Sequence, residues 1–131
     1  MTLTSDEKAN LIRYRVNQAI ESAELAAVLI EMNKHSAAVN RIYYAIFYCL
    51  LALAVKYEFE TSKHLQLIGW FNKNFIASGI IESEFGTIAR KCYEYRRAAD
   101  YDAYVVINKE NVESLLFQMN LFIDRINKLL N

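Results

Sequence analysis

Proline is absent from the sequence, and only three glycines occur among its 131 residues. Because proline breaks helices and glycine weakens them, their scarcity favours a helical chain over a sheet-rich or disordered one. Neither sign of charge is in excess, since 15 Lys and Arg side chains balance 15 Asp and Glu side chains. This balance excludes a global positive field that would attract nucleic acid, so any such binding needs a local cluster of charge.

Cysteine and histidine are also scarce, with two of each. Cys49 and Cys92 are far apart and lie within apolar helical patterns, which is typical of small buried side chains rather than of a disulfide or a metal site. No glycine-rich phosphate loop and no HExxH spacing is present. We therefore predict no metal and no cofactor. The polar N-terminal residues do not have the pattern of a signal peptide, so we expect a cytoplasmic protein that does not enter a membrane.

The most prominent segment is the apolar stretch 36–57, which has no charged residue and no glycine over residues 42–55. Fourteen apolar or aromatic residues are too few to span a bilayer, so this stretch predicts a buried core helix. Ser36 is the residue expected to cap its start. A helix that is apolar on all sides must be covered by its own domain or by a second copy, and we predict a homodimer.

Apolar residues at helical spacing predict a first helix that begins after Thr4, three residues before Glu7 in the capping-box arrangement. This helix should end before a polar connection at residues 33–35, in which His35 is expected to be exposed. Residues 101–107 break the helical period, and Asn108 should cap the last helix.

The third helix is expected to begin at Ser62 and to end at Gly79, with an apolar contact from Ile80, and the fourth to begin at Ser83. The sequence thus predicts one all-α domain, residues 1–131, built as an up-and-down antiparallel bundle of four to five helices.

Strict alternation of helix direction makes a prediction about the ends of this bundle. The start of the third helix, with His64, should lie at the same end as the last turn of the fourth helix. The start of the central helix should lie at the opposite end. Arg41 is therefore expected to be structural and to pair with Glu24 or Glu31 of the first helix.

Charged and phenolic side chains gather in the last turns of the fourth helix and just beyond it: Arg90, Lys91, Tyr93, Glu94, Tyr95, Arg96, Arg97, Asp100, Tyr101, Asp102 and Tyr104. One interpretation is structural, because cations suit the negative C-terminus of a helix and Asp100 can pair with Arg96 four residues earlier. The other is functional, because guanidinium donors beside carboxylates and phenols suit a phosphate or nucleotide. His64 nearby would add a group that exchanges protons near neutral pH.

Three segments in this order carry a family resemblance: Asn-Arg-Ile-Tyr-Tyr-Ala-Ile-Phe at 40–47, Ser-Lys-His at 62–64, and Arg-Ala-Ala-Asp-Tyr-Asp at 97–102. They resemble the HEPN domains of prokaryotes, specifically a small stand-alone branch. The resemblance implies a helical bundle that dimerises, with a cleft at the dimer interface. It also implies a relationship to metal-independent endoribonucleases, which are often toxins encoded beside a minimal nucleotidyltransferase antitoxin.

The motif of that family is an arginine followed, after four to six residues, by a histidine, with a tyrosine two residues further in the toxin branch. The resemblance places Arg97, Asp102 and Tyr104 at these positions. Asp102 departs from the motif, because an ionised carboxylate accepts a proton but does not readily donate one.

Two functions therefore stay open, beside a purely structural helical dimer. The first is a toxin that acts on RNA, with Arg97, Asp102 and His64 as its catalytic residues. The second is a non-catalytic module that binds a nucleotide, RNA or the partner nucleotidyltransferase. Its binding residues would be Arg96, Arg97, Asp100 and Tyr101. Tyr104 is either a site that the partner nucleotidyltransferase modifies or a ring packed under the connection to the last helix.

Overall fold

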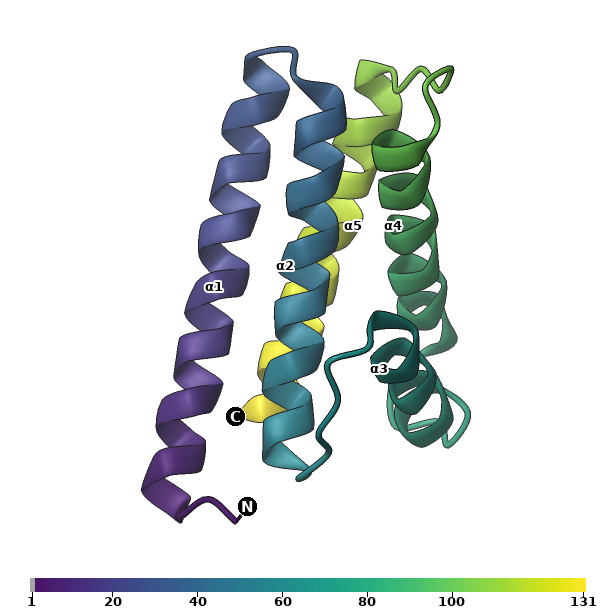
Figure 1. Cartoon of the computed structure of the whole chain (residues 1–131). Helices are drawn as coiled ribbons and strands as arrows, with labels where there is room; N and C mark the ends of the chain where they lie inside the picture. The colour runs from purple at the N-terminus through teal and green to yellow at the C-terminus, as the bar shows by residue number, and fades with distance from the viewer. Residues whose placement is uncertain (1) are drawn as a thin grey trace.

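A computed structural model describes residues 2–131 as a bundle of helices (Figure 1). The elements are α1 (Ser5–Glu31), α2 (His35–Lys56), α3 (His64–Phe71), a π-helical turn η1 (Asn72–Ile76), α4 (Ser83–Tyr101) and α5 (Lys109–Leu130). No strand occurs in the part of the chain described by the structure. The predicted all-α bundle is therefore confirmed.

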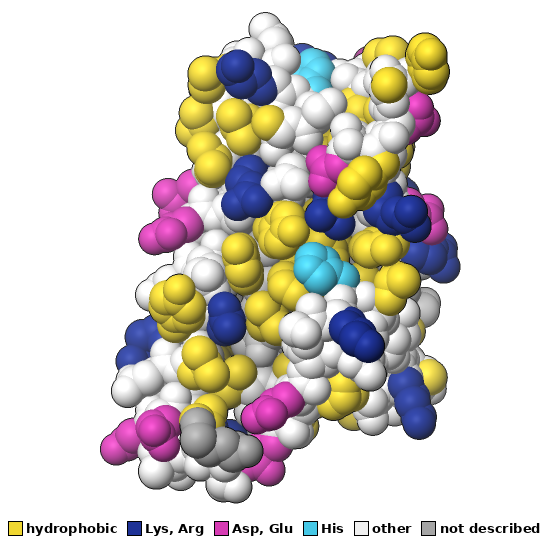
Figure 2. Space-filling view, viewed as in Figure 1, with side chains coloured by type: hydrophobic (Ala, Val, Ile, Leu, Met, Phe, Trp, Pro, Cys, Tyr) yellow, Lys and Arg dark blue, Asp and Glu magenta, His cyan; other side chains and the backbone are white. Residues whose placement is uncertain are grey.

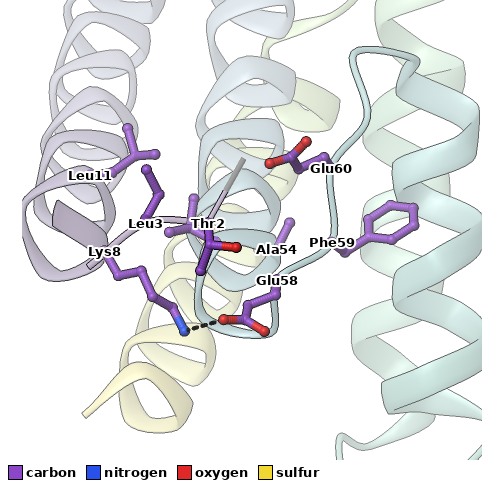
Figure 3. A pocket seen from close by; sticks show the side chains of 9 residues that line it. Thr2, Leu3, Lys8, Leu11, Ala54, Glu58, Phe59 and Glu60 are labelled. Carbon is purple, nitrogen blue, oxygen red and sulfur yellow. Dashed lines mark hydrogen bonds and ion pairs between the residues drawn. The ribbon is translucent and has the colours of Figure 1, made fainter. Parts of the chain in front are cut away.

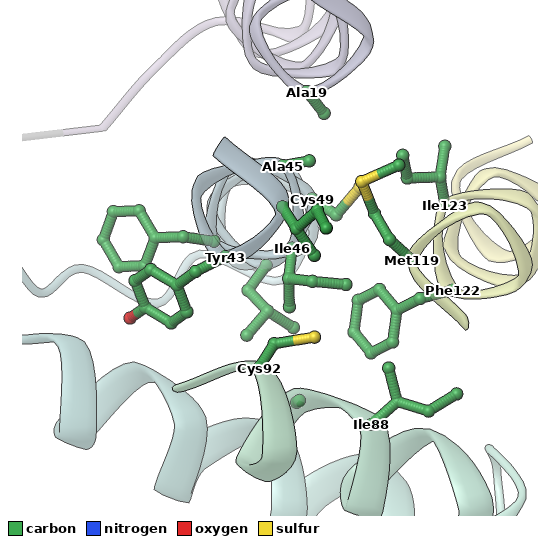
Figure 4. Packing of buried hydrophobic residues seen from close by; sticks show 14 of the residues in the cluster. Ala19, Tyr43, Ala45, Ile46, Cys49, Ile88, Cys92, Met119, Phe122 and Ile123 are labelled. Atoms are coloured by element: carbon green, nitrogen blue, oxygen red, sulfur yellow. The ribbon is translucent and has the colours of Figure 1, made fainter. Parts of the chain in front are cut away.

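The central helix α2 packs against α1, α4 and α5. Figure 4 shows Ile46 and Cys49 of α2 facing Cys92 of α4 and Phe122 of α5. By length and composition α2 could cross a membrane, but 67% of its most apolar window is buried inside the domain, as in the core helix of a bundle. One copy of the chain covers most of this helix, so the apolar run by itself does not require a second copy.

Two of the predicted helix starts are confirmed by their hydrogen bonds. The Thr4 hydroxyl accepts from the Glu7 backbone N–H at 3.1 Å, and the Glu7 carboxylate accepts from the Thr4 N–H at 2.8 Å. These two bonds form the complete capping box. At the other end of the chain, the Asn108 side chain accepts from the Asn111 N–H at 2.8 Å and caps α5.

Two other predicted caps are wrong, since the N-cap positions are occupied by Lys34 rather than Ser36 and by Lys63 rather than Ser62. The helix α2 begins at His35 rather than after Ser36, because Asn33 adopts the left-handed conformation (φ 59°) and reverses the chain at once. The helix α3 begins at His64, and the hydroxyl of Thr61, not of Ser62, accepts from the Lys63 N–H at 3.1 Å. Neither helix start has a side-chain cap.

Gly79 ends the α3–η1 segment in the left-handed conformation (φ 82°), as predicted. The apolar residue that closes this end is Ile81, which is 1% exposed and whose N–H donates to the carbonyl of Phe75 at 2.8 Å. The prediction for Ile80 is wrong, since that side chain is 52% exposed. The helix α4 then begins at Ser83, as expected.

The largest correction concerns which helix ends meet. Residues 57–63 run back along α2 as an extended connection, so that the short α3 starts partway up the bundle and descends (Figure 1). The helix α4 therefore rises toward the start of α2, which strict alternation placed at the opposite end. Two contacts record this arrangement: the Asn40 amide donates to Asp100 at 3.4 Å, and His35 Nδ1 lies 3.1 Å from the carbonyl oxygen of Ile107. His35 is thus half-buried, not exposed as predicted.

Candidate functional site

The first turns of α2, the first residue of α3 and the last turns of α4 bring together a set of polar and aromatic side chains. We call this set the Arg96 cluster; it consists of Asn40, Arg41, Tyr43, Tyr44, His64, Arg96 and Asp100. Figure 2 shows the same face of the bundle, on which basic, acidic and hydrophobic side chains surround a histidine near the middle. The cluster depends on the back-turning connection before α3, which sequence periodicity alone does not reveal.

The centre of the cluster is an ion pair between Arg96 and Asp100 on one face of α4. The Arg96 Nε lies 2.9 Å from Asp100 Oδ2, and the two side chains are only 16% and 28% exposed. The angle at Nε is too poor for a hydrogen bond, so the contact is chiefly electrostatic. The i,i+4 pairing predicted from sequence is therefore present in the structure.

Aromatic rings surround the Arg96 guanidinium. Its central carbon lies 5.4 Å from the ring centre of Tyr43, 5.6 Å from that of Tyr44 and 6.0 Å from that of Tyr101. Its Nη2 also donates to the Tyr44 hydroxyl at 3.4 Å. Such rings stabilise a cation through their quadrupoles while removing part of its water shell. Arg96 is consequently held in place as a partly desolvated positive charge.

Asn40 and Arg41 join this centre to α1. The Asn40 amide donates to Asp100, and its carbonyl oxygen accepts from Arg41 Nε at 3.1 Å and Nη2 at 2.7 Å. Arg41 also donates to the Ser22 hydroxyl at 3.4 Å and lies 5.0 Å from the Tyr44 ring centre. The predicted ion pairs of Arg41 with Glu24 or Glu31 do not form.

Tyr43 and His64 form a short hydrogen bond, with 2.7 Å between the phenol oxygen and Nδ1. The imidazole stacks on Phe47 with ring centres 4.1 Å apart, which fixes its plane. Burial raises the pKa of Tyr43 well above its usual value of 10, although the nearby Arg96 acts in the opposite direction. The phenol thus stays protonated near neutral pH.

Burial, and secondarily the positive charge of Arg96, lowers the pKa of His64 below its usual 6.5. The imidazole is therefore mainly neutral at pH 7. When the Tyr43 phenol donates to Nδ1, the ring proton resides on Nε2. His64 can then donate a hydrogen bond from Nε2, and it can take up a second proton if an anion arrives.

The residues aligned with the family motif do not join this cluster. Arg97 is exposed and forms no hydrogen bond or ion pair within residues 2–131, since it lies about 100° around the helix from Arg96. The Asp102 carboxylate accepts from the Tyr104 backbone N–H at 2.9 Å and closes the turn after α4. No hydrogen bond joins Asp102 to Arg97 or His64 in the described part of the chain. The two neighbouring arginines therefore do not act as one fork.

Tyr104 is 93% exposed and Tyr101 is 73% exposed. The ring of Tyr104 does not pack under the connection to α5, so that alternative is wrong. Its phenol lies open to any partner that approaches this end of the bundle.

Sequence reasoning missed Tyr43 and Tyr44 as site residues and placed Asn40 and Arg41 at the wrong end. One signal was available, namely a polar Asn-Arg pair followed by two tyrosines at the entrance of an otherwise apolar helix. Burying four polar side chains so close together in a helix is unfavourable unless they hydrogen-bond with one another or with a ligand.

Two shallow depressions flank the Arg96 cluster. The first, about 470 Å³ in volume, is lined by Lys63, His64, Leu65, Gln66, Tyr93 and Arg96. The second, about 330 Å³, is lined by Leu29, Ser36, Ala37, Asn40, Arg41 and Asp100. The first exposes basic and imidazole groups, whereas the second contains the Asp100 carboxylate. The first is therefore better suited to a phosphate.

A further depression of about 440 Å³ lies at the opposite end of the bundle, between the N-terminal segment and the connection after α2 (Figure 3). Its charged groups are Lys8 and Glu58, which form an ion pair at 3.1 Å, and Glu60. The excess of negative charge and the absence of an imidazole from its lining make it poorly suited to a phosphate.

Comparison with known proteins agrees with this architecture. The sequence model of the HEPN domain family matches residues 12–129 of this chain. A protein of Thermotoga maritima named "UPF0332 protein" is 34% identical over 125 residues, which are 95% of this chain and 95% of that protein. Two proteins of Methanocaldococcus jannaschii are also similar. "Putative toxin MJ0142" is 35% identical over 88% of this chain and 78% of its own length, and "Putative toxin MJ0605" is 36% identical over 91% of both.

The fold and the site together define the class of protein. It is a helical bundle with a cluster of arginine, tyrosine and histidine side chains across α2, α3 and α4. The chain belongs to the HEPN domain family. Its resemblance to toxin-like members of that family is supported by the two archaeal relatives.

Proposed function

We propose that this HEPN protein is the toxin-like component of a pair with a minimal nucleotidyltransferase, and that it acts on RNA through the Arg96 cluster. The observation that carries the proposal is the guanidinium of Arg96, held between tyrosine rings beside the His64 imidazole. Arginine binds phosphate oxygens in a fixed geometry, and the exposed ring of Tyr101, whose centre lies 6.0 Å from the Arg96 guanidinium carbon, can stack on an unpaired base. A site of this composition suits single-stranded RNA.

Cleavage of RNA without a metal needs two proton transfers. The 2′-hydroxyl loses a proton as its oxygen attacks phosphorus, and the departing 5′-oxygen gains a proton as the P–O bond breaks. When the Tyr43 oxygen accepts from Nδ1–H, the bare Nε2 of the neutral His64 ring can take the proton of the 2′-hydroxyl and then give it to the departing 5′-oxygen. Arg96 can stabilise the charge that develops on the phosphoryl oxygens.

His64 thereby offers a replacement for the motif histidine, whose place in the chain is occupied by Asp102. The replacement comes from α3, whereas the motif lies at the end of α4.

The second candidate function is binding without cleavage. It is favoured by the Arg96–Asp100 ion pair, because a carboxylate 2.9 Å from the guanidinium competes with a phosphate for the same charge. In this alternative the protein binds a nucleotide or RNA and performs no chemistry.

One experiment separates these functions. The purified protein is incubated with single-stranded RNA, and both cleavage and binding are measured for the wild type, for Arg96→Gln and for His64→Gln. We expect at least tenfold slower cleavage for each variant. Binding without cleavage by the wild type would support the second function.

The matched control is Arg90→Gln. Arg90 lies on the same helix, is exposed, and forms an ion pair with Glu94 at 3.8 Å. Its replacement should leave RNA cleavage unchanged. Unchanged cleavage by Arg96→Gln together with loss of cleavage by Arg97→Gln would move the site to the family-motif position and overturn the assignment to the Arg96 cluster.

A further inference from the structure

The depression between α3 and α4 collects hydrogen-bond donors without a competing carboxylate in its lining. Lys63, His64 and Gln66 come from the start of α3, and Tyr93 and Arg96 come from α4. Asp100 pairs with Arg96 but is not part of this lining; it lines the second depression instead. The local charge is therefore positive although the whole chain is neutral.

The backbone adds donors to the same place. The helix α3 starts without a side-chain cap, and the N–H groups of His64, Leu65 and Gln66 have no acceptor in the described part of the chain. These residues themselves line the depression. An uncapped helix start carries partial positive charge and favours an anion. The side chains of Arg96 and His64 form the site, and the helix start strengthens it.

We infer that this depression binds a terminal phosphate, the monoester group at the end of an RNA or of a nucleotide, and that binding is coupled to uptake of a proton by His64. The inference deepens the proposed function and rests on it for the choice of a nucleic-acid ligand.

The preference for a monoester follows from charge. A monoester carries between one and a half and two negative charges at pH 7, whereas an internal phosphodiester carries one. Lys63 and Arg96 together, with one charge offset by the Asp100 carboxylate that pairs with Arg96, leave one positive charge to balance the first negative charge of the phosphate. The second negative charge of the monoester can stabilise the protonated form of His64, which is otherwise disfavoured by burial and by the charge of Arg96. A diester provides less of this stabilisation.

The surroundings of His64 allow such a proton. From α2 it is faced by Tyr43, through the 2.7 Å contact, and by Tyr44, with ring centres 5.9 Å apart. From α4 it is faced by Arg96 and Tyr93, and Lys63 precedes it in the chain. No carboxylate is among these groups. The charge that most readily stabilises the imidazolium is therefore that of a ligand.

The Tyr43 phenol can accommodate both protonation states. It can donate to Nδ1 while the imidazole is neutral, and its oxygen can accept from Nδ1–H once the ring is charged. The hydrogen bond thus persists through the proton uptake, and Nε2–H can donate to the phosphate in both states.

The test measures the pKa of His64 by NMR, in the free protein and in the presence of saturating sulfate, AMP or the diester adenylyl-adenosine. Sulfate stays a dianion throughout the pH range, so any pH dependence of its binding reports a proton on the protein. AMP represents the monoester. Adenosine, which has no phosphate, is the control ligand.

We expect sulfate and AMP to raise the pKa of His64 by one unit or more, and sulfate to bind at least about twofold more tightly at pH 6 than at pH 8. AMP should bind at least tenfold more tightly than adenylyl-adenosine or adenosine. In His64→Gln the pH dependence of sulfate binding should disappear, and in Arg96→Gln the affinity should fall at least tenfold. His35→Gln, which changes the other histidine, should behave as the wild type.

An unchanged His64 pKa in saturating sulfate and AMP, or a diester that binds as tightly as AMP, would overturn the inference. Circular dichroism of each variant verifies the fold, and the wild-type NMR titration distinguishes these outcomes even if a variant does not fold.

The RNA assay separates this inference from the proposed function. Binding of AMP with a raised His64 pKa, but no action on RNA, would leave the phosphate site standing and reject the RNA function. Equal cleavage of RNA with and without a terminal phosphate, together with no AMP binding, would support the RNA function and reject the phosphate site.

Discussion

The Tyr43 phenol oxygen lies 2.7 Å from His64 Nδ1, and this contact ties the buried face of α2 to the first residue of α3. Tyr43 is 1% exposed, whereas His64 lines an open depression. A rigid core residue therefore sets the orientation of a ring that reaches solvent. This relationship makes Tyr43 a positioning residue for the proposed chemistry of His64.

Tyr43→Phe should keep the fold, because the ring stays in place and only the hydroxyl is lost. We expect a loss of about 1 kcal/mol in the free energy of unfolding, the usual net contribution of one hydrogen bond. The proton on the His64 ring should redistribute between its two nitrogens, which ¹⁵N NMR of the imidazole can show. An unchanged ¹⁵N spectrum would contradict the positioning role. Tyr95→Phe, which removes the hydroxyl of a partly buried tyrosine on α4, is the control.

The protonation of His64 predicts a pH dependence of stability. Its folded pKa is lowered below 6.5, so the unfolded chain binds the proton more tightly than the folded one. The contribution to stability is then complete above about pH 6.5 and is lost as the pH falls toward the folded pKa. Urea unfolding between pH 7.5 and 5 should show this decline, and His64→Gln should flatten it. A decline of the same size in His64→Gln would assign it to other groups.

A homodimer is our next prediction. Residues Tyr48, Leu51 and Val55 form a partly exposed stripe on α2, on the same face as Tyr44. A second copy that uses the same stripe would cover it through a two-fold axis. Sedimentation equilibrium at micromolar concentration should therefore give twice the monomer mass of 15.2 kDa.

Tyr48→Glu should then yield a monomer that remains helical, because it places a charge in the contact. Leu121→Glu, at an exposed apolar position of α5, should remain dimeric. A wild type that sediments at 15.2 kDa rules out the dimer.

The last prediction concerns modification of Tyr104 by a partner enzyme. Its phenol is 93% exposed just after the end of α4, so a nucleotidyltransferase could attach a nucleotide to it without unfolding the domain. We expect mass spectrometry to find an added nucleotide on Tyr104 after co-expression of this protein with a minimal nucleotidyltransferase. Tyr104→Phe should remove the addition. Modification confined to Tyr101 would show that the alignment of Arg97, Asp102 and Tyr104 with the motif is wrong.

The sequence by itself determined the helices, the burial of most of residues 42–55, the caps of the first and last helices, and the family. These features depend on local propensity and on periodicity, which neighbouring residues encode. The Thr4–Glu7 box and the Asn108 cap are confirmed because each is formed by residues three positions apart. The i,i+4 pair of Arg96 and Asp100 is present for the same reason.

Only the tertiary structure decided which polar side chains meet. The extended return of residues 57–63 reverses the simple alternation of helices and brings the end of α4 to Asn40, while His64 lies near Arg96, as the sequence predicted. That return depends on how a short α3 packs against α2 and α4, a balance of long-range contacts with no period in the sequence. The site lies where these long-range contacts bring the three helices together, which is why its members could be named from the sequence only in part.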